Sequence, residues 1–370
     1  MGYCLQPFSR ACGRGYCVSV LELSRVVDAI EGVVAPEERA LLVGHREIFS
    51  RLKNQSDDGR LPGGILLHGP RGVGKATLAF ALARHVLETT SDETPLRIKE
   101  QIAMGVHPNV LVLRIAPRDP KAFYTRIRIE EVRGLVHKLH QTRGRAGSRI
   151  CIVDSIDDCT APAANALLKV LEEPPADTHF MLISHRPGKL LPTIRSRCQA
   201  QVFRPLDEVD MTRVLKESGA GAEQVRQALA LAGGRPRRAL EALSMAENDV
   251  LQSLTDWLQS PDTGSVIEQM NIAETLAVRK NVMASGFARE ILRDWIANET
   301  RAAVADTQGT ASRGRGRLAS ANLLWEKANA LFDDADSFNL DARQTLLSLL
   351  DAIKSHVQNT SASTITDNPE

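Results

Sequence analysis

Short apolar runs alternate with segments of helical spacing along the chain as far as Pro205. The runs have the length and composition of buried strands, and they occupy Ile65–His68, Val110–Ile115, Arg149–Val153 and Phe180–Ser184. Strands that alternate with helices in this way form a parallel sheet with helices on both faces. The pattern therefore predicts an α/β core.

The helices predicted for this core carry apolar residues on one face. In Ala76–Leu87, for example, Leu78, Leu82 and Val86 recur every four residues. Other helices are predicted after a loop within Pro36–Leu52, over Arg128–Leu139, and over Ala163–Glu173, where Pro174 and Pro175 end the helix. Polar residues at Asn54–Gly59 predict a break, and residues 89–107 predict a polar, loop-like region with some helix.

Beyond Pro205 the strand pattern ends and only helical spacing remains. Residues 207–247 predict small helices around a turn at Gly233–Pro236, and Asp249–Val357 predicts a bundle with breaks near Pro261 and at Thr307–Gly316. Three apolar stripes of that bundle can close one core. The stripes are Phe287, Ile291, Leu292 and Trp295; Leu323, Leu324, Ala328 and Leu331; and Leu346, Leu347, Leu350 and Ile353.

These patterns divide the chain into five predicted parts. They are a disordered extension over residues 1–24, an α/β core over 25–205, a small helical domain over 206–247, a helical bundle over 248–357 and a disordered tail over 358–370. Arg313, Arg315 and Arg317 fall at the second break of the bundle, where we expect a mobile loop and leave contact with DNA open.

Composition narrows the functional classes. The 370 residues are enough for two or three domains, and the hydrophobic fraction of 43% supports a sizeable core. Aromatic residues make up only 4%, which argues against a groove that stacks single-stranded bases. The net charge of +1 means that any nucleic-acid partner would have to meet a local basic patch.

The six cysteines show no C-x-x-C spacing, and Cys4, Cys12 and Cys17 have no histidine nearby, so no zinc is expected. Reduced thiols favour a cytoplasmic protein. No apolar stretch approaches the length of a membrane span, and Tyr16–Leu23 is too interrupted for a signal-peptide core.

The stretch Gly69–Lys75 (GPRGVGK) matches the G-x-x-x-x-G-K part of a Walker A phosphate loop. It follows a predicted strand and precedes a predicted helix, as that motif requires. Gly69, Gly72 and Gly74 allow backbone N–H groups to turn toward phosphate oxygens, and Lys75 adds a full positive charge. The alternative is a glycine-rich turn with a chance lysine.

Two positions around this loop lack the residues that hydrolysis uses. Ala76 stands where a Ser or Thr hydroxyl would bind Mg²⁺, and Thr77 is rotated from that direction by about 100° along a helix. Asp154 ends a predicted strand and is the Walker B candidate, unless it merely terminates that strand. Ser155 follows it in place of an acidic residue. We therefore expect ATP or ADP to bind, Mg²⁺ to be held weakly and hydrolysis to be weak or absent.

Three further stretches resemble the clamp-loader ATPases of the AAA+ class. They are Ala163–Pro175 (AANALLKVLEEPP), Thr178–Ser184 (THFMLIS) and Leu191–Cys198 (LPTIRSRC). The resemblance extends from about Pro36 to Val357, and within the class it is greatest to the δ′ subunits of bacterial DNA polymerase III. It implies an AAA+ core, a helical lid and a C-terminal helical collar.

The resemblance also assigns roles to single residues. It makes Arg197 an arginine finger that acts in trans on a neighbour's nucleotide, although an arginine at this place can also be merely solvated. Ser184 takes the sensor-1 position and Arg238 the sensor-2 position. Arg235 and Arg237 are close alternatives to Arg238, and a basic helix start would look the same.

The partners implied are the γ/τ and δ subunits of a ring-shaped, pentameric hetero-oligomer, and through it the sliding clamp and primed DNA. The whole would work within a polymerase holoenzyme that carries out nucleotidyl transfer. Many relatives carry a cysteine zinc module after the phosphate loop, and this chain has no cysteine between Gly69 and Val110. The competing hypothesis is an autonomous AAA+ ATPase; a small-molecule kinase is disfavoured because no substrate lid motif accompanies the loop.

Overall fold

The computed structural model describes residues 29–30, 33–39, 41–119, 122–141, 145–245, 249–278, 282–306, 313–338 and 340–365. The extension predicted over residues 1–24 lies outside them. The chain forms two compact units, and each is described by itself. The first comprises Met1–Gly219 with Gly234–Arg237, and the second comprises Ala220–Gly233 with Arg238–Glu370. The predicted boundaries of core, lid and collar stay a prediction.

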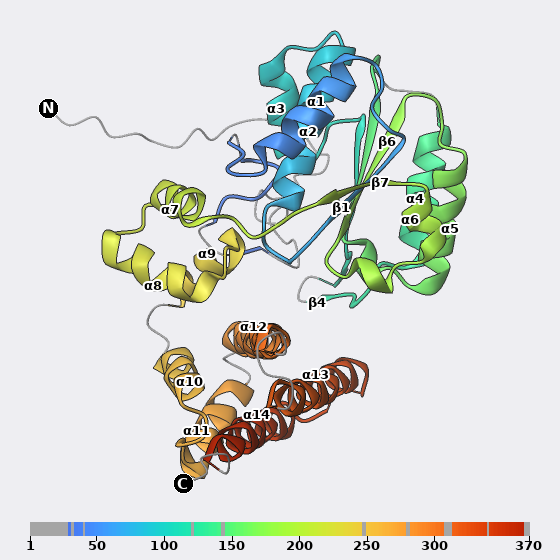
Figure 1. Cartoon of the computed structure of the whole chain (residues 1–370). Helices are drawn as coiled ribbons and strands as arrows, with labels where there is room; N and C mark the ends of the chain where they lie inside the picture. Colours follow the sequence, from blue (N-terminus) through green and yellow to red (C-terminus); the bar gives the residue numbers. More distant parts are fainter. Residues whose placement is uncertain are drawn as a thin grey trace, which may run out of the picture. The chain divides into compact units, whose positions relative to one another are not determined.

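A parallel five-stranded sheet forms the centre of the first unit (Figure 1). Its order is β2-β5-β6-β1-β7. The strands are β1 (Gly64–His68), β2 (Val110–Leu113), β5 (Arg149–Asp154), β6 (Thr178–Ser184) and β7 (Gln199–Val202). Residues of β5 and β6 are buried almost throughout, as expected for strands covered on both faces. The predicted α/β class with a parallel sheet is confirmed.

Helices cover both faces of this sheet (Figure 1). One apolar cluster joins Leu78 and Leu82 of α2 to alternate residues of β1, β5 and β6, together with Leu52 and Ile98. The other joins Leu135 and Leu167 to the opposite faces of the same strands. The helices concerned are α1 (Arg46–Asp57), α2 (Lys75–Thr90), α3 (Pro95–Ala103), α4 (Ile129–His140), α5 (Ala161–Glu172) and α6 (Pro192–Ser196).

The first unit differs from the sequence prediction in a few elements. Helix α1 continues to Asp57, so the break predicted at Asn54–Gly59 is wrong for Asn54 to Asp57. The Asp58 amide still donates to Asn54 O, as in a helix. The chain turns only at Gly59, which has a φ of 66°. Strand β7 was not predicted, nor was the small hairpin of β3 (Pro117–Asp119) and β4 (Ala122–Phe123). Helix α7 (Glu208–Glu217) is capped by the Asp207 carboxylate, which accepts from the Asp210 amide.

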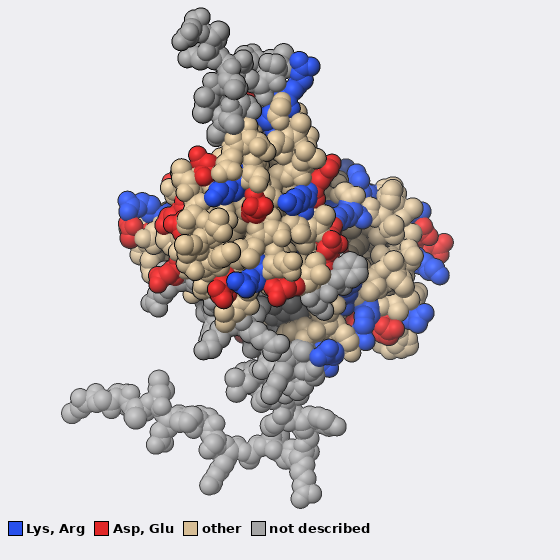
Figure 2. Space-filling view, turned by 90° about the horizontal axis from the view of Figure 1, so that it is seen from below, with Lys and Arg blue, Asp and Glu red and all other residues tan. Residues whose placement is uncertain are grey.

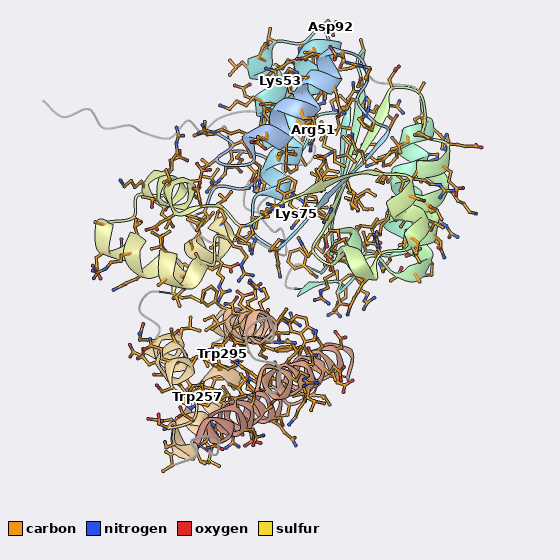
Figure 3. All side chains as sticks on the ribbon, viewed as in Figure 1. Arg51, Lys53, Lys75, Asp92, Trp257 and Trp295 are labelled. Atoms are coloured by element: carbon orange, nitrogen blue, oxygen red, sulfur yellow. The ribbon has the colours of Figure 1, made fainter. Side chains whose placement is uncertain are left out.

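In the described part of the second unit, all regular secondary structure is helical. It contains α8 (Ala222–Ala232), most of α9 (Pro236–Ser244), α10 (Asp249–Gln259), α11 (Val266–Ala277), α12 (Val282–Asp306), α13 (Arg313–Phe338) and α14 (Ala342–Ile365). Gly233 and Gly234 form the predicted turn with positive φ angles. The Trp295 indole N–H, on one of the two labelled tryptophans in Figure 3, donates to Leu258 O and joins α12 to α10.

Three predictions for this unit are corrected. Helix α13 begins at Arg313, so Arg313, Arg315 and Arg317 are helical and not part of a mobile loop. Helix α14 continues to Ile365, so the tail is not disordered from residue 358 to that point. Leu323 is 67% exposed and does not belong to the core, although Leu324 and Ala328 beside it are buried.

Acidic and basic side chains are interspersed on the face that Figure 2 shows, as the small net charge leads one to expect. Among the described residues, no helix combines the length and the apolar character needed to cross a membrane.

Candidate nucleotide-binding site

The phosphate loop Gly69–Lys75 joins β1 to the start of α2, where Figure 3 labels Lys75. Gly69 and Gly72 have φ angles of 146° and 82°, which glycine adopts without steric cost. A Cβ on Gly69 would lie 2.2 Å from the Phe203 carbonyl oxygen, and one on Gly72 would lie 2.7 Å from Arg237 Cβ. The loop therefore needs glycine at both positions, and it leads into the N-terminus of a 16-residue helix, where anions are stabilised.

Lys75 is 3% exposed, and its Nζ donates to the carbonyl oxygens of Gly69 and Pro70, each at 2.6 Å. Burial lowers the pKa of the Lys75 ammonium to about 7, although the carboxylates of Asp154 and Asp157 act in the opposite direction. A phosphate group beside the ammonium would favour its charged form. Lys75 thus titrates near neutral pH, and its charge would be coupled to phosphate binding.

The loop is also fixed from outside. His45 Nε2 lies 3.0 Å from Val73 O, which is a donor geometry when that nitrogen carries the proton. Burial lowers the pKa of His45, so the neutral ring is favoured at pH 7. Sequence reasoning gave no role to His45.

Asp154 ends β5, as predicted, and faces a cation. Strand β2 pairs with β5 so that Leu113 is opposite Val153, which brings the next residues, Arg114 and Asp154, side by side. Arg114 Nε lies 3.7 Å from Asp154 Oδ2, and the Nη1 and Nη2 groups donate to the two carboxylate oxygens of Glu37 at 2.8 and 3.2 Å. Sequence reasoning missed Arg114, whose only signal was its place directly after a strand.

The residues after Asp154 bond among themselves and to β6. The Ser155 hydroxyl donates to Asp158 Oδ2 at 2.7 Å. The Ser184 hydroxyl, at the end of β6, donates to Asp157 Oδ1 at 3.0 Å, and Asp157 also accepts from the His185 amide. Ser184 is opposite His68 in the sheet, and its carbonyl oxygen accepts from the Gly69 amide at 3.3 Å.

The structure thus brings four predicted features together at the carboxyl ends of β1, β5 and β6. They are the phosphate loop with Lys75, the Ala76–Thr77 pair that follows it on α2, Asp154 and Ser184. Asp157, three residues beyond Asp154, contributes to the same edge through Ser184 and its effect on Lys75.

Arg237 and Arg238 have different surroundings. The Arg237 amide donates to Gly72 O at 3.1 Å, so this residue lies against the phosphate loop in the first unit. Arg238 belongs to the second unit, where it is buried and pairs with Asp294, with its guanidinium 5.4 Å from the Phe287 ring centre. The sensor-2 role of Arg238 stays a prediction, and Arg237 is a second candidate that the sequence had left open.

Arg197 directly follows α6 and is exposed. Its Nη1 donates to Thr193 O at 3.0 Å, and its Nη2 lies 2.8 Å from Glu172 Oε1 at the end of α5. Both members of this ion pair are more than one-third exposed, so the pair contributes little to stability. The guanidinium is held only loosely at the surface.

The residues present do not fit a tightly bound Mg²⁺. The methyl group of Ala76 offers no oxygen ligand, and the Asp154 carboxylate is next to the Arg114 guanidinium. Since Mg²⁺ requires an octahedral set of oxygen ligands, a guanidinium at the carboxylate competes with the ion for the same charge.

A family model described as "DNA polymerase III, delta subunit" matches residues 44–207. DNA polymerase III subunit delta′ of Pseudomonas aeruginosa is 37% identical over 180 residues, which are 46% of this chain and 52% of that protein. The chain thus spans about half the length of that relative. DNA polymerase III subunit tau of Salmonella typhimurium is 30% identical over 241 residues, covering 63% of this chain and 35% of that protein.

DNA polymerase III subunit delta′ of Escherichia coli is 30% identical over 235 residues, covering 61% of this chain and 69% of that protein. This match and the family model both name subunits of DNA polymerase III, and the residues that the family model matches include the phosphate loop at residues 69–75. The chain belongs to the family of DNA polymerase III delta′ subunits.

Proposed function

We propose that this chain is the δ′-type subunit of a clamp loader that helps to place a sliding clamp on primed DNA during replication. In this proposal it binds ATP or ADP without efficient hydrolysis and donates Arg197 to the nucleotide of a neighbouring ATPase subunit. Its partners are γ/τ and δ subunits in a ring-shaped hetero-oligomer. Nucleotidyl transfer belongs to the polymerase of the holoenzyme, and we propose none for this chain.

The observation that carries the proposal is a phosphate loop that is intact while its catalytic surroundings are altered. Gly69, Gly72 and Gly74 have positive φ angles, and Lys75 directs its Nζ into the loop, where it donates to Gly69 O. The site is a poor one for Mg²⁺, because Ala76 has no hydroxyl and Asp154 contacts Arg114. It also lacks an acidic residue directly after Asp154 to orient water, since that position is Ser155. Binding without turnover is the function that best suits such a site.

The proposed role of Arg197 is supported by its position at the surface. A planar guanidinium placed against a γ-phosphate stabilises the charge of phosphoryl transfer. The Glu172 partner is exposed, and a surface ion pair of this kind is exchanged easily for a phosphate. The likeness to a tau subunit as well as to delta′ subunits agrees with an assembly of related chains.

Reconstitution with γ/τ and δ subunits tests the finger. In that complex, Arg197→Ala should lower DNA-stimulated ATP hydrolysis at the neighbouring site by about 10³-fold and reduce clamp loading, because the transition-state charge loses its cation. Assembly, measured by size-exclusion chromatography with light scattering, should be unchanged.

Arg195→Ala is the matched control, since Arg195 is also exposed, lies on the short helix that Arg197 follows, and its removal changes the charge by the same amount. Unchanged loading with Arg197→Ala rejects the finger role. Rapid ATP turnover by the purified chain alone, abolished by Lys75→Ala, would favour the autonomous ATPase instead.

A further inference from the structure

We propose that Arg114 takes the place of the divalent cation in this site, so that the chain binds nucleotide independently of Mg²⁺. This inference rests on the proposed nucleotide binding. Arg114 would offset the negative charge at Asp154 that Mg²⁺ offsets in metal-dependent sites.

The position of Arg114 is set by the sheet. Strands β2 and β5 are parallel neighbours, and their register carries Arg114 and Asp154 to the same carboxyl edge at which the phosphate loop begins. The contact of 3.7 Å between Arg114 Nε and Asp154 Oδ2 is an ion pair between partly buried groups, which are 18% and 26% exposed. It therefore lies in surroundings where solvent screens charge less than at an open surface.

Arg114 is fixed on its other side by Glu37. Both guanidinium Nη groups donate to the Glu37 carboxylate. Burial raises the pKa of that carboxyl, but the hydrogen bonds and the charge of Arg114, with a backbone hydrogen bond, together outweigh burial and leave the pKa below its ordinary value, so Glu37 is charged at pH 7. A bidentate pair of this kind fixes the plane of the guanidinium as well as its place.

The segment that carries Glu37 is itself held to α2. Arg84, which is buried, donates from Nη1 to Glu37 O at 3.1 Å and from Nη2 to Arg39 O at 2.8 Å. The Arg114 guanidinium also lies 5.4 Å from the ring centre of Phe80 on the same helix. Arg114 is thus held by Glu37 and lies against Phe80 of α2, so a movement away from Asp154 would break both contacts.

A carboxylate beside a phosphate loop repels the nucleotide unless a cation neutralises it. In metal-dependent sites Mg²⁺ does so and is held there with help from a Ser or Thr hydroxyl. Here Ala76 gives no such hydroxyl, and a permanently charged guanidinium, shared between Glu37 and Asp154, already offsets part of the negative charge of Asp154. Arg114 thus makes the metal unnecessary for binding and, through like-charge repulsion, makes its entry unfavourable.

Isothermal titration of the full chain with ATP tests the inference directly. One titration contains Mg²⁺ in excess over ATP, and the other contains EDTA in excess. We expect the two dissociation constants to agree within roughly threefold, which corresponds to less than about 1 kcal/mol.

Arg114→Ala should weaken binding in EDTA by roughly tenfold or more, and added Mg²⁺ should restore part of it, since Asp154 then loses the guanidinium beside it. Arg114→Lys, which retains the charge, should keep the binding in EDTA closer to that of the unchanged chain. Arg133→Ala, on the exposed side of α4, removes the same charge away from the site and should change neither titration.

The possible outcomes separate the two proposals. Binding of the unchanged chain only with Mg²⁺ overturns the role of Arg114 and leaves nucleotide binding standing. Binding in neither titration overturns both. Unaltered binding by a folded Arg114→Ala variant in EDTA also overturns the role of Arg114. If that variant does not fold, the two titrations of the unchanged chain still decide, because they require no substitution.

Discussion

At the scale of single residues, Lys75 makes nucleotide binding dependent on pH. Because burial brings its pKa to about 7, the ammonium is largely charged at pH 6 and largely neutral at pH 8.5. Phosphate binds the charged form, so above pH 7 binding must take up a proton. We therefore expect the affinity for ATP to fall as pH rises from 6 to 8.5, measured by titration in buffers of equal ionic strength. In Lys75→Met, binding should be lost throughout this range.

Lys75 should affect the stability of the nucleotide-free chain in the opposite direction. The unfolded chain keeps this proton up to a pKa of about 10.4, whereas the folded chain loses it near pH 7. Between these values the unfolded state binds more protons, so folding stability rises with pH. Urea unfolding at pH 7 and pH 9 should show this rise in the unchanged chain relative to Lys75→Met. The same pH dependence in both proteins would contradict the assignment.

The residues that sequence reasoning found are those whose role depends on local order along the chain. The phosphate loop is of this kind, because its glycines, its lysine and the following helix are contiguous. The position of Arg114 beside Asp154 depends on β2 being the neighbour of β5 in the sheet, and no local sequence pattern reveals this pairing. Arg237 and Arg238 are consecutive on a helix and point about 100° apart, so their surroundings could be told apart only from the folded chain.

At the scale of elements, a polar cluster joins three helices of the second unit. Glu299 on α12 accepts hydrogen bonds from Arg317 on α13 at 2.9 Å and from His356 on α14 at 3.2 Å, when His356 Nε2 carries the proton. His356 Nδ1 lies 2.7 Å from the Ser320 hydroxyl on α13. The hydrogen bond from His356 and the charge of Arg317 hold the pKa of Glu299 below its ordinary value, against the effect of burial.

Glu299→Gln should therefore destabilise the bundle by about 1–3 kcal/mol at pH 7, because the buried His356 and the half-buried Arg317 lose a charged acceptor. A carboxyl with a lowered folded pKa stabilises the fold above its unfolded pKa, and this contribution is lost as pH falls through the folded value. The difference between the two proteins in urea unfolding should thus shrink below pH 4.5. Glu326→Gln, at an exposed position of α13, is the control. A loss with Glu326→Gln equal to that with Glu299→Gln would contradict the role of the cluster.

The elements that the sequence did not reveal are those formed by tertiary contacts. Strand β7 has polar Gln199 and Gln201 in place of an apolar run, and it forms because β1 pairs with it at the edge of the sheet. Its buried Gln201 accepts a hydrogen bond from Arg51 of α1. The start of α13 contains glycines and arginines that favour a loop, but Arg317 pairs with Glu299 and Asp306 of α12. Apolar spacing alone predicts neither element.

At the scale of the whole molecule, the chain passes between its two units at Gly219, at Gly233 and again at Arg237. The phosphate loop, Arg114, Asp154, Ser184 and Arg197 all belong to the first unit. The Glu299 cluster belongs to the second. A ligand at the phosphate loop and a substitution at Glu299 therefore act on different units, so each provides a separate probe of the chain's stability.

ATP should stabilise the first unit selectively. A ligand at a concentration of 100 times its dissociation constant stabilises the state that binds it by about 2.7 kcal/mol. In differential scanning calorimetry we expect ATP to raise the transition of the first unit and leave the second in place, whereas Glu299→Gln should lower only the second. Lys75→Met should abolish the shift with ATP and so identify the transition that contains the loop. If ATP and Glu299→Gln each moved a single common transition, the two units would unfold as one cooperative body, and binding at the loop would be felt throughout the bundle.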